Sequence, residues 1–328
     1  MQRLFGQNTI VQVVTLLAVM AMLWARPLAQ AAPMAAADGY APLYTALLNL
    51  HIPSTLAIIL AILLILLGGF YLNVLLVRTN LTRQNSLLPT FLYCLFMSAT
   101  ATTLSPTLLA NLLILPILNL LLLRGTLLTV SSDKIFGVAA LIAIASMVYL
   151  PMLSLLIAYL LVAINYRLYS WREWAILLLG LLAPYILLWG FHFATGTLAD
   201  CFAAIGQGLA DLDIRISHTS TPVMLANLLL VAVAAWSIFS LWNRLGEHPV
   251  AWQKNAVTVM LAAVSGLVML FYSTLMPANL QLFAAPFALC GTRMLSTPQR
   301  SHHRQRRQWT VWVNDTILIL IVIAAIVC

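Results

Sequence analysis

The sequence carries very little charge. Only 7% of its 328 residues are charged, whereas 63% are hydrophobic. A soluble domain carries roughly 25% charged residues, so this chain has too few to cover a surface that faces water. We therefore expect most of the surface to face lipid. Because no hydrophilic stretch is long enough for a soluble domain, residues 1–328 are predicted to form a single integral membrane domain.

Cysteines and the common catalytic motifs are also scarce. The four cysteines show no paired spacing for zinc, haem or a disulfide framework, which favours a role as small hydrophobic fillers. The sequence has no P-loop, zinc motif, nucleophile elbow or glycine-rich dinucleotide fingerprint. No chain of Asp, Glu or His runs through the apolar segments, as it does in proton-coupled pumps. We therefore expect no resident cofactor, with a divalent metal as the alternative left open.

Long apolar runs dominate what is present. Several reach the roughly 20 apolar residues that cross a bilayer as a helix. The pattern predicts an all-α, polytopic transmembrane helix bundle of about eleven spans. The fifth and sixth spans are short and meet at Leu150-Pro151, and the tenth is short enough to be tilted or re-entrant. The predicted spans are residues 9–25, 54–77, 87–104, 107–123, 135–150, 152–166, 174–195, 222–242, 255–273, 278–292 and 310–328.

The positive charges test this alternation of spans. If the N-terminus is cytoplasmic, fourteen of the sixteen lysines and arginines fall in inside segments, and only Arg26 and Arg215 lie outside. Positive residues are retained on the cytoplasmic side of a membrane. The split therefore supports both the span count and a cytoplasmic N-terminus.

The first apolar run has some features of a signal peptide. Arg3 precedes it, it extends from Ile10 to Trp24, and Ala29-Gln30-Ala31 follows it. Arg26-Pro27, between the run and the alanine-rich stretch, fits a cleavable signal less well. We therefore predict an uncleaved first helix.

A basic run, Arg300 to Arg307, lies in a predicted cytoplasmic loop of about residues 293–308. Such a run can bind nucleic acid. Between two hydrophobic spans, it is better placed to anchor the topology and to contact anionic lipid headgroups. We therefore expect membrane lipids as partners and no nucleic acid, and the sequence names no protein partner.

Two longer loops lie on the predicted outer face, at about residues 26–53 and 196–221. In the second loop, apolar residues recur at spacings of three and four from Leu198 to Ile216, which is the apolar stripe of a helix. The pattern predicts an amphipathic helix lying in the outer interface. A solvated face explains its polar residues, and the alternative is that they bind a ligand or act as a base. These residues are Asp200, Asp211, Arg215 and His218.

The first outer loop contains one acid, Asp38, just before a segment that re-enters the membrane through Pro42 and Pro53. His51 closes this loop, and His192 lies near the outer end of the seventh span. An ionisable residue within a span is a functional hypothesis by default. A histidine close to the interface is as often satisfied by the bundle itself, so both interpretations stay open.

Two stretches carry a resemblance to known families. DGYAPLYTALLN (residues 38–49) and RTNLTRQNSLLPTFLYCLFMS (residues 78–98) resemble an uncharacterised family of bacterial multi-span inner-membrane proteins. That resemblance covers most of the chain and implies a bacterial inner-membrane location. Tyr40-Ala41-Pro42-Leu43-Tyr44, before the second span, is similar to the GT-C superfamily of membrane glycosyltransferases. This wider resemblance implies that Asp38 acts as a base or metal ligand.

These features predict a protein that handles a polyprenyl-linked sugar or glycan at the outer face of the membrane. As an enzyme, it would be a membrane glycosyltransferase that uses a lipid-linked donor, with Asp38 as general base. The alternative is a non-catalytic permease or flippase, or a scaffold subunit of an envelope complex. The candidates for binding the acceptor, a metal or the phosphate of a polyprenyl-phosphate lipid are Asp200, Asp211, Arg215, His218, His192 and His51.

The sidedness of the second loop tests the span count. We expect Gly208→Cys, in a chain lacking Cys201, to react with a membrane-impermeant maleimide in intact cells. Labelling would place the amphipathic helix outside and leave lipid-linked donors as the relevant chemistry. Labelling only after lysis would contradict the alternation and favour nucleotide-linked donors.

Overall fold

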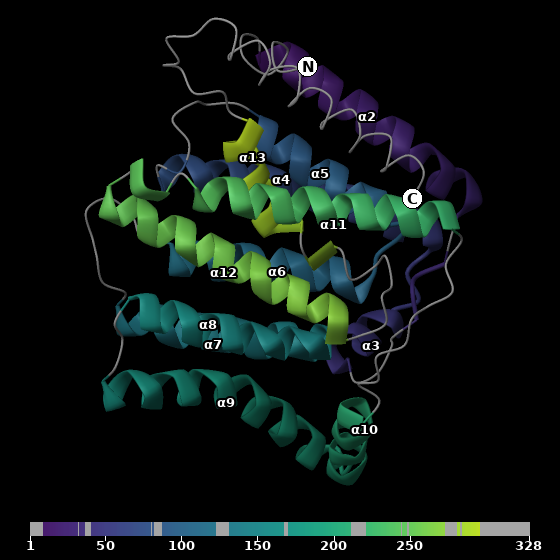
Figure 1. Cartoon of the computed structure of the whole chain (residues 1–328). Helices are drawn as coiled ribbons and strands as arrows, with labels where there is room; N and C mark the ends of the chain where they lie inside the picture. The colour runs from purple at the N-terminus through teal and green to yellow at the C-terminus, as the bar shows by residue number, and fades with distance from the viewer. Residues whose placement is uncertain are drawn as a thin grey trace, which may run out of the picture.

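The computed structural model describes residues 9–31, 33–36, 41–79, 81, 87–122, 131–166, 170–210, 221–243, 245–247, 249–272, 281–282 and 284–295. This part of the chain is all-helical and contains no strand (Figure 1). Short 3-10 helices cover Leu150–Ser154 and Leu245–Glu247. The α-helices are α2 (Thr9–Gln30), α3 (Pro42–Leu48), α4 (Ser54–Arg78), α5 (Leu88–Thr100), α6 (Pro106–Leu121), α7 (Ser132–Val148), α8 (Leu155–Asn165), α9 (Trp171–Ala194), α10 (Leu198–Ala210), α11 (Thr221–Trp242), α12 (Val250–Tyr272) and α13 (Ala284–Leu295).

The all-α prediction is confirmed for the described residues, and the first ten predicted spans each overlap an α-helix. Three helical stretches are long and apolar enough to cross a membrane: Gln12–Gln30, Ser54–Arg78 and Trp171–Ala194. They indicate a membrane protein. The full count of eleven spans stays a prediction, and residues 310–328 lie outside the described residues.

The tenth predicted span differs most from the structure. The sequence places it at residues 278–292, whereas α13 begins only at Ala284 and has 12 residues. A helix of this length is about 18 Å long, well short of the roughly 30 Å hydrocarbon core. This fits the expectation of a short tenth segment.

Local signals explain where several helices begin and end. Ser170 and Glu173 form a reciprocal capping box at the start of α9. Ser105 caps α6, where its hydroxyl accepts a hydrogen bond from the Leu108 N–H at 3.2 Å. Pro151 has no N–H to donate to the carbonyl of Met147, so α7 cannot continue through it, and a 3-10 helix starts at Leu150 instead.

The long helices lie side by side along roughly one direction, which gives the bundle two ends (Figure 1). At one end, the Tyr166 hydroxyl donates to the Leu121 carbonyl at 3.3 Å, and the Lys254 ammonium lies 5.7 Å from the centre of the Tyr166 ring. The end of α6, the end of α8 and the start of α12 therefore meet there. We call this the basic end, because four of the five cations with described side chains lie at helix termini there: Arg78, Lys134, Arg172 and Lys254.

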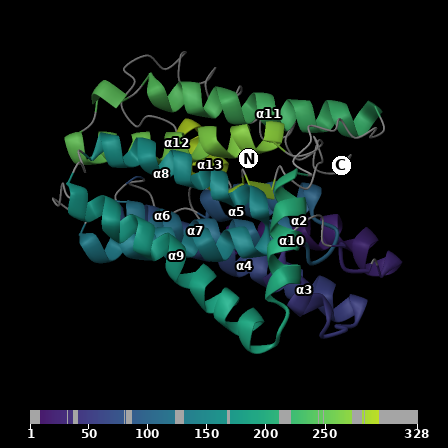
Figure 2. The same cartoon turned by 90° about the horizontal axis from the view of Figure 1, so that it is seen from below.

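The amphipathic helix predicted in the second loop is confirmed over Leu198–Ala210 as α10. It lies crosswise to the long helices at the end opposite the basic end (Figures 1 and 2). Cys201 is buried against Leu150, and the Phe202 ring lies 5.4 Å from that of Trp189. Part of its apolar face therefore packs on protein, because α9 and the 3-10 helix lie beside it. Asp200 is exposed, as the pattern predicted.

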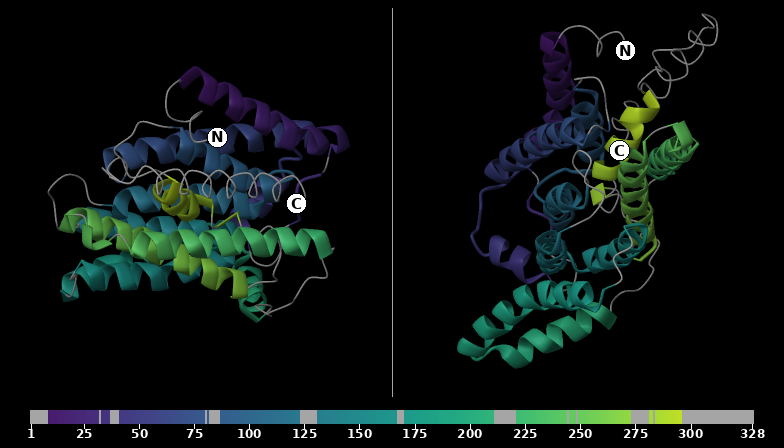
Figure 3. Two further views of the ribbon diagram at one scale, coloured as in Figure 1. Left: turned by 45° about the horizontal axis from the view of Figure 1, so that its top comes forward. Right: turned by 90° about the vertical axis from the view of Figure 1, so that its left-hand side faces the viewer.

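Figures 1 and 3 place α2 and α9 at opposite margins of the bundle. The outer side of α9 is apolar and open, with Leu179 60% and Leu187 77% exposed. Its inner side approaches α7 closely at Gly180. A Cβ atom there would lie only 2.7 Å from the Phe136 carbonyl oxygen. The Tyr185 and Ser146 hydroxyls, 2.6 Å apart, join the same two helices.

The contact at Gly180 yields a matched pair of substitutions. We expect Gly180→Ala to destabilise the protein by about 1–3 kcal/mol, because the added methyl group overpacks the α7–α9 contact. Gly190→Ala lies on the same helix and has no atom within 4 Å of the added methyl group. It should be neutral or stabilising by up to about 1 kcal/mol through helix propensity.

Thermal unfolding of the purified protein in detergent measures both effects. A Gly180→Ala protein that unfolds at or above the midpoint of Gly190→Ala would contradict this close packing.

Candidate functional site

Several residues predicted from sequence lie outside the described part of the chain. These are Asp38, Asp211, Arg215 and His218, together with the basic run Arg300 to Arg307. Their roles stay predictions. The structure does describe Asp200, His192 and His51, all located away from the basic end.

His192 joins the end of α9 to the start of α10. Its Nδ1 lies 2.8 Å from the Thr197 hydroxyl, which lies 2.9 Å from the Thr195 hydroxyl. The Thr197 carbonyl accepts a hydrogen bond from the Cys201 N–H, so Thr197 stands at the start of α10. His192 therefore has a structural role at this corner, and its role in ligand binding stays a prediction.

His51 occupies the turn between α3 and α4. Its φ of +48° lies in the left-handed region, which histidine adopts more readily than most residues. The ring is exposed, and its Nδ1 lies 2.7 Å from the Asn49 carbonyl oxygen. No hydrogen bond or ion pair among the described residues joins His51, His192 and Asp200. Nor does any group of three or more His, Cys, Asp or Glu residues in that part form a metal site.

The structure instead assembles a buried polar cluster between α5, α6 and the segment Gln281–Leu282. The Tyr93 hydroxyl donates to Asn111 Oδ1 at 2.9 Å, and Asn111 Nδ2 donates to the Gln281 carbonyl. The Gln281 Oε1 atom accepts from the Thr107 hydroxyl at 2.8 Å and from the Ser105 hydroxyl at 3.1 Å. Each of these five side chains is at most 8% exposed.

Local features of α4, α5 and α6 allow the cluster to form. Ser105 lies at the cap of α6, which places it and Thr107 at the same end of that helix, a turn or more before Asn111. On α4, Gly68 leaves room for the Tyr93 hydroxyl, since a Cβ atom there would lie 2.9 Å from it. The cluster thus depends on a glycine in one helix and a cap in another.

Further polar atoms surround the linker between α5 and α6. The Tyr44 hydroxyl lies 2.6 Å from the Ala35 carbonyl oxygen and 3.1 Å from that of Leu104. Thr103 is 4% exposed, and its hydroxyl has no hydrogen-bond partner among the described residues. All these groups are neutral. They can recognise hydroxyl or amide groups through hydrogen bonds, but they provide no charge for an ion.

One member of this cluster can be recognised in the sequence. Asn111 is a polar residue inside an apolar segment, and such residues can bridge helices. Its partner, Gln281, is 170 residues away in sequence. No local pattern near Gln281 indicates this pairing, so only the tertiary structure brings the two together.

The fold and the site define a broad class: an all-helical protein with helices long enough to cross a membrane and a neutral polar cluster inside the bundle. Comparison of the chain with family models, with curated proteins and with solved structures gives no match. The family resemblances that the sequence motifs carry therefore remain proposals.

Two asparagines test the cluster. We expect Asn111→Leu to destabilise the protein by about 1–3 kcal/mol, because it leaves the Tyr93 hydroxyl and the Gln281 carbonyl buried without partners. Asn73→Leu is the control, since Asn73 is half-buried on α4 and lies outside the cluster. It should have little effect on the unfolding midpoint in detergent. Equal midpoints for the two variants would show that the cluster does not hold the 281–282 segment in place.

Proposed function

We propose that this chain is a multi-pass protein of the bacterial inner membrane that handles a polyprenyl-linked sugar or glycan at the outer face. The observation that carries the proposal is the buried polar cluster, which extends from the start of α6 to Tyr93 in the middle of α5. Its hydroxyl, amide and carbonyl groups match the donors and acceptors of sugar hydroxyls. The apolar outer side of helices such as α9 suits the polyprenyl tail.

The distribution of charge supports the orientation in this proposal. Four cations lie at the basic end: Arg78, Lys134, Arg172 and Lys254. Arg26 lies near the C-terminal end of α2, at the opposite end of the bundle. Since cytoplasmic segments retain positive residues, the basic end is assigned to the cytoplasm. The loops at about 26–53 and 196–221 then belong to the outer side, together with Ser105 and Thr107 at the start of α6.

In the catalytic form of the proposal, the chain is a GT-C-like glycosyltransferase with a lipid-linked donor. Asp38 takes the proton from the acceptor hydroxyl as that oxygen attacks the sugar, and the lipid phosphate leaves. Asp211, Arg215 and His218 bind the acceptor or the phosphate, for which arginine provides a bidentate fork. The motif at residues 40–44, which is similar to that of GT-C glycosyltransferases, is the sequence feature that favours this form.

A non-catalytic form is the second candidate. The polar cluster contains only neutral groups, which bind a hydroxylated cargo but cannot accept a proton at neutral pH. This observation favours a permease or flippase for a lipid-linked or neutral solute. A scaffold subunit of an envelope complex is the third form, in which the open side of α9 would contact another subunit.

Neutralising Asp38 separates these forms. In the catalytic form, Asp38→Asn should abolish the lipid-linked product in membrane extracts while the protein is still expressed, because the acceptor hydroxyl loses its base. Asp133→Asn, an exposed acid at the basic end, serves as the control and should leave the product unchanged.

Unchanged product with Asp38→Asn would rule out the catalytic form. If Asp38→Asn and Asp133→Asn both flip a fluorescent polyprenyl-linked sugar in reconstituted vesicles, this would then support the flippase. Stable co-purification with a partner and no flipping would support the scaffold.

A further inference from the structure

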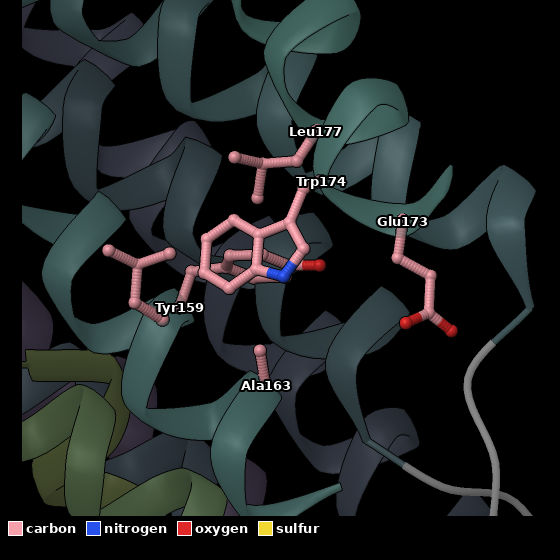
Figure 4. Close-up of a pocket in the computed structure, with 6 residues that line it drawn as sticks. Tyr159, Ala163, Glu173, Trp174 and Leu177 are labelled. Atoms are coloured by element: carbon pink, nitrogen blue, oxygen red, sulfur yellow. The ribbon is translucent and has the colours of Figure 1, made fainter. Parts of the chain in front are cut away.

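A notch lies between α8 and α9 at the basic end, and none of its lining residues belongs to the polar cluster. Its walls are Tyr159, Leu160 and Ala163 of α8 and Glu173, Trp174 and Leu177 of α9. Figure 4 shows Trp174 and Leu177 extending from α9 toward Tyr159 of α8, with the Glu173 carboxylate to one side of them. The notch, including its open mouth, holds about 220 Å³.

The notch combines a carboxylate with two aromatic rings. Glu173 Oε2 accepts the Ser170 N–H at 3.0 Å in the capping box, whereas its Oε1 accepts no hydrogen bond from the described residues. The Tyr159 hydroxyl likewise has no hydrogen bond within that part of the chain, although Tyr159 is only 4% exposed. The Trp174 ring is 42% exposed and forms the outer wall.

These groups provide the hydrogen-bond acceptors and the negative charge that an ammonium group binds. An alkylammonium carries a positive charge and three N–H donors. A carboxylate oxygen and a phenol oxygen each accept one donor, and the face of a tryptophan ring attracts a cation within about 6 Å. No lysine or arginine side chain in the described part of the chain lines the notch. An ammonium group bound there would therefore come from outside this lining.

We propose that the notch binds the headgroup of phosphatidylethanolamine, with the primary ammonium held by Glu173, Tyr159 and Trp174. The proposal rests on the membrane location of the chain and not on the handling of a glycan. The acyl chains lie along the open apolar side of α9, where Leu178 is 56% exposed. Arg172, exposed in the same turn as Glu173, provides the charge for the lipid phosphate.

The size of the notch selects among ammonium headgroups. Its closed part has room for about one water-sized group. A primary ammonium is close to this size, whereas the trimethylammonium of phosphatidylcholine is much larger. The position at the first turn of α9 is also appropriate, since tryptophan, here Trp171 and Trp174, is enriched at the level of lipid headgroups.

Lipid binding to the purified full-length protein tests the proposal. Native mass spectrometry on delipidated protein would compare phosphatidylethanolamine, phosphatidylcholine and phosphatidylglycerol with identical acyl chains. We expect phosphatidylethanolamine to bind about tenfold more tightly than the other two, as for charge-assisted hydrogen bonds to one carboxylate. Equal or weaker binding of phosphatidylethanolamine would overturn the proposal.

Two substitutions locate the site. Glu173→Gln keeps the capping box, because glutamine also caps at this position, but removes the charge. It should abolish the preference for phosphatidylethanolamine. Trp174→Leu should weaken binding of this lipid several-fold. The matched controls are Asp133→Asn, another first-turn acid at the basic end, and Trp171→Leu, an 85% exposed tryptophan outside the notch.

Both controls should retain the preference of the unmodified protein. A preference that survives Glu173→Gln, or is lost equally in Asp133→Asn, would overturn the assignment to the notch. Because binding is measured without any glycan, failure of this test leaves the proposed function unaffected, and loss of glycan handling leaves the notch unaffected.

Discussion

Close approach of helix backbones at a few glycines is the constraint on which the bundle depends. In lipid, contact between two apolar helices offers little hydrophobic gain over contact with lipid, so tight packing and interhelical hydrogen bonds hold helices together. At Gly69, a Cβ atom would lie 2.9 Å from Thr90, and the Thr90 hydroxyl donates to the Gly69 carbonyl at 3.0 Å. Gly180 brings α9 equally close to α7. At both positions an added Cβ atom would require the neighbouring helix to shift.

The buried polar cluster is a consequence of this packing. Gly68 leaves room for the Tyr93 hydroxyl, which reaches Asn111, and Asn111 binds the backbone of Gln281. Buried polar groups that are fully paired rigidify an apolar interior, whereas unpaired ones destabilise it. The cluster thus holds the segment before α13 against α6.

The two ends of the bundle carry different chemistry. One end combines cations at helix termini with the notch that contains Glu173. The other combines neutral hydroxyls and amides with α10 and the long loops. No residue that lines the notch belongs to the polar cluster, so each can be altered by substitution without changing the other.

The sequence by itself determined the helices, because apolar runs and caps are local properties. The predicted span 54–77 corresponds to α4 at Ser54–Arg78, and the three-and-four spacing after Leu198 identified α10. Only the tertiary structure decided that Asn111 pairs with Gln281, that Cys201 packs on Leu150, and that Tyr159 and Glu173 line the same notch. These pairings join residues that are distant in sequence, and apolar helices of similar hydropathy can pack in many registers. The choice among registers depends on side-chain shape and on the pairing of the few buried polar groups. A local sequence pattern does not indicate either of these.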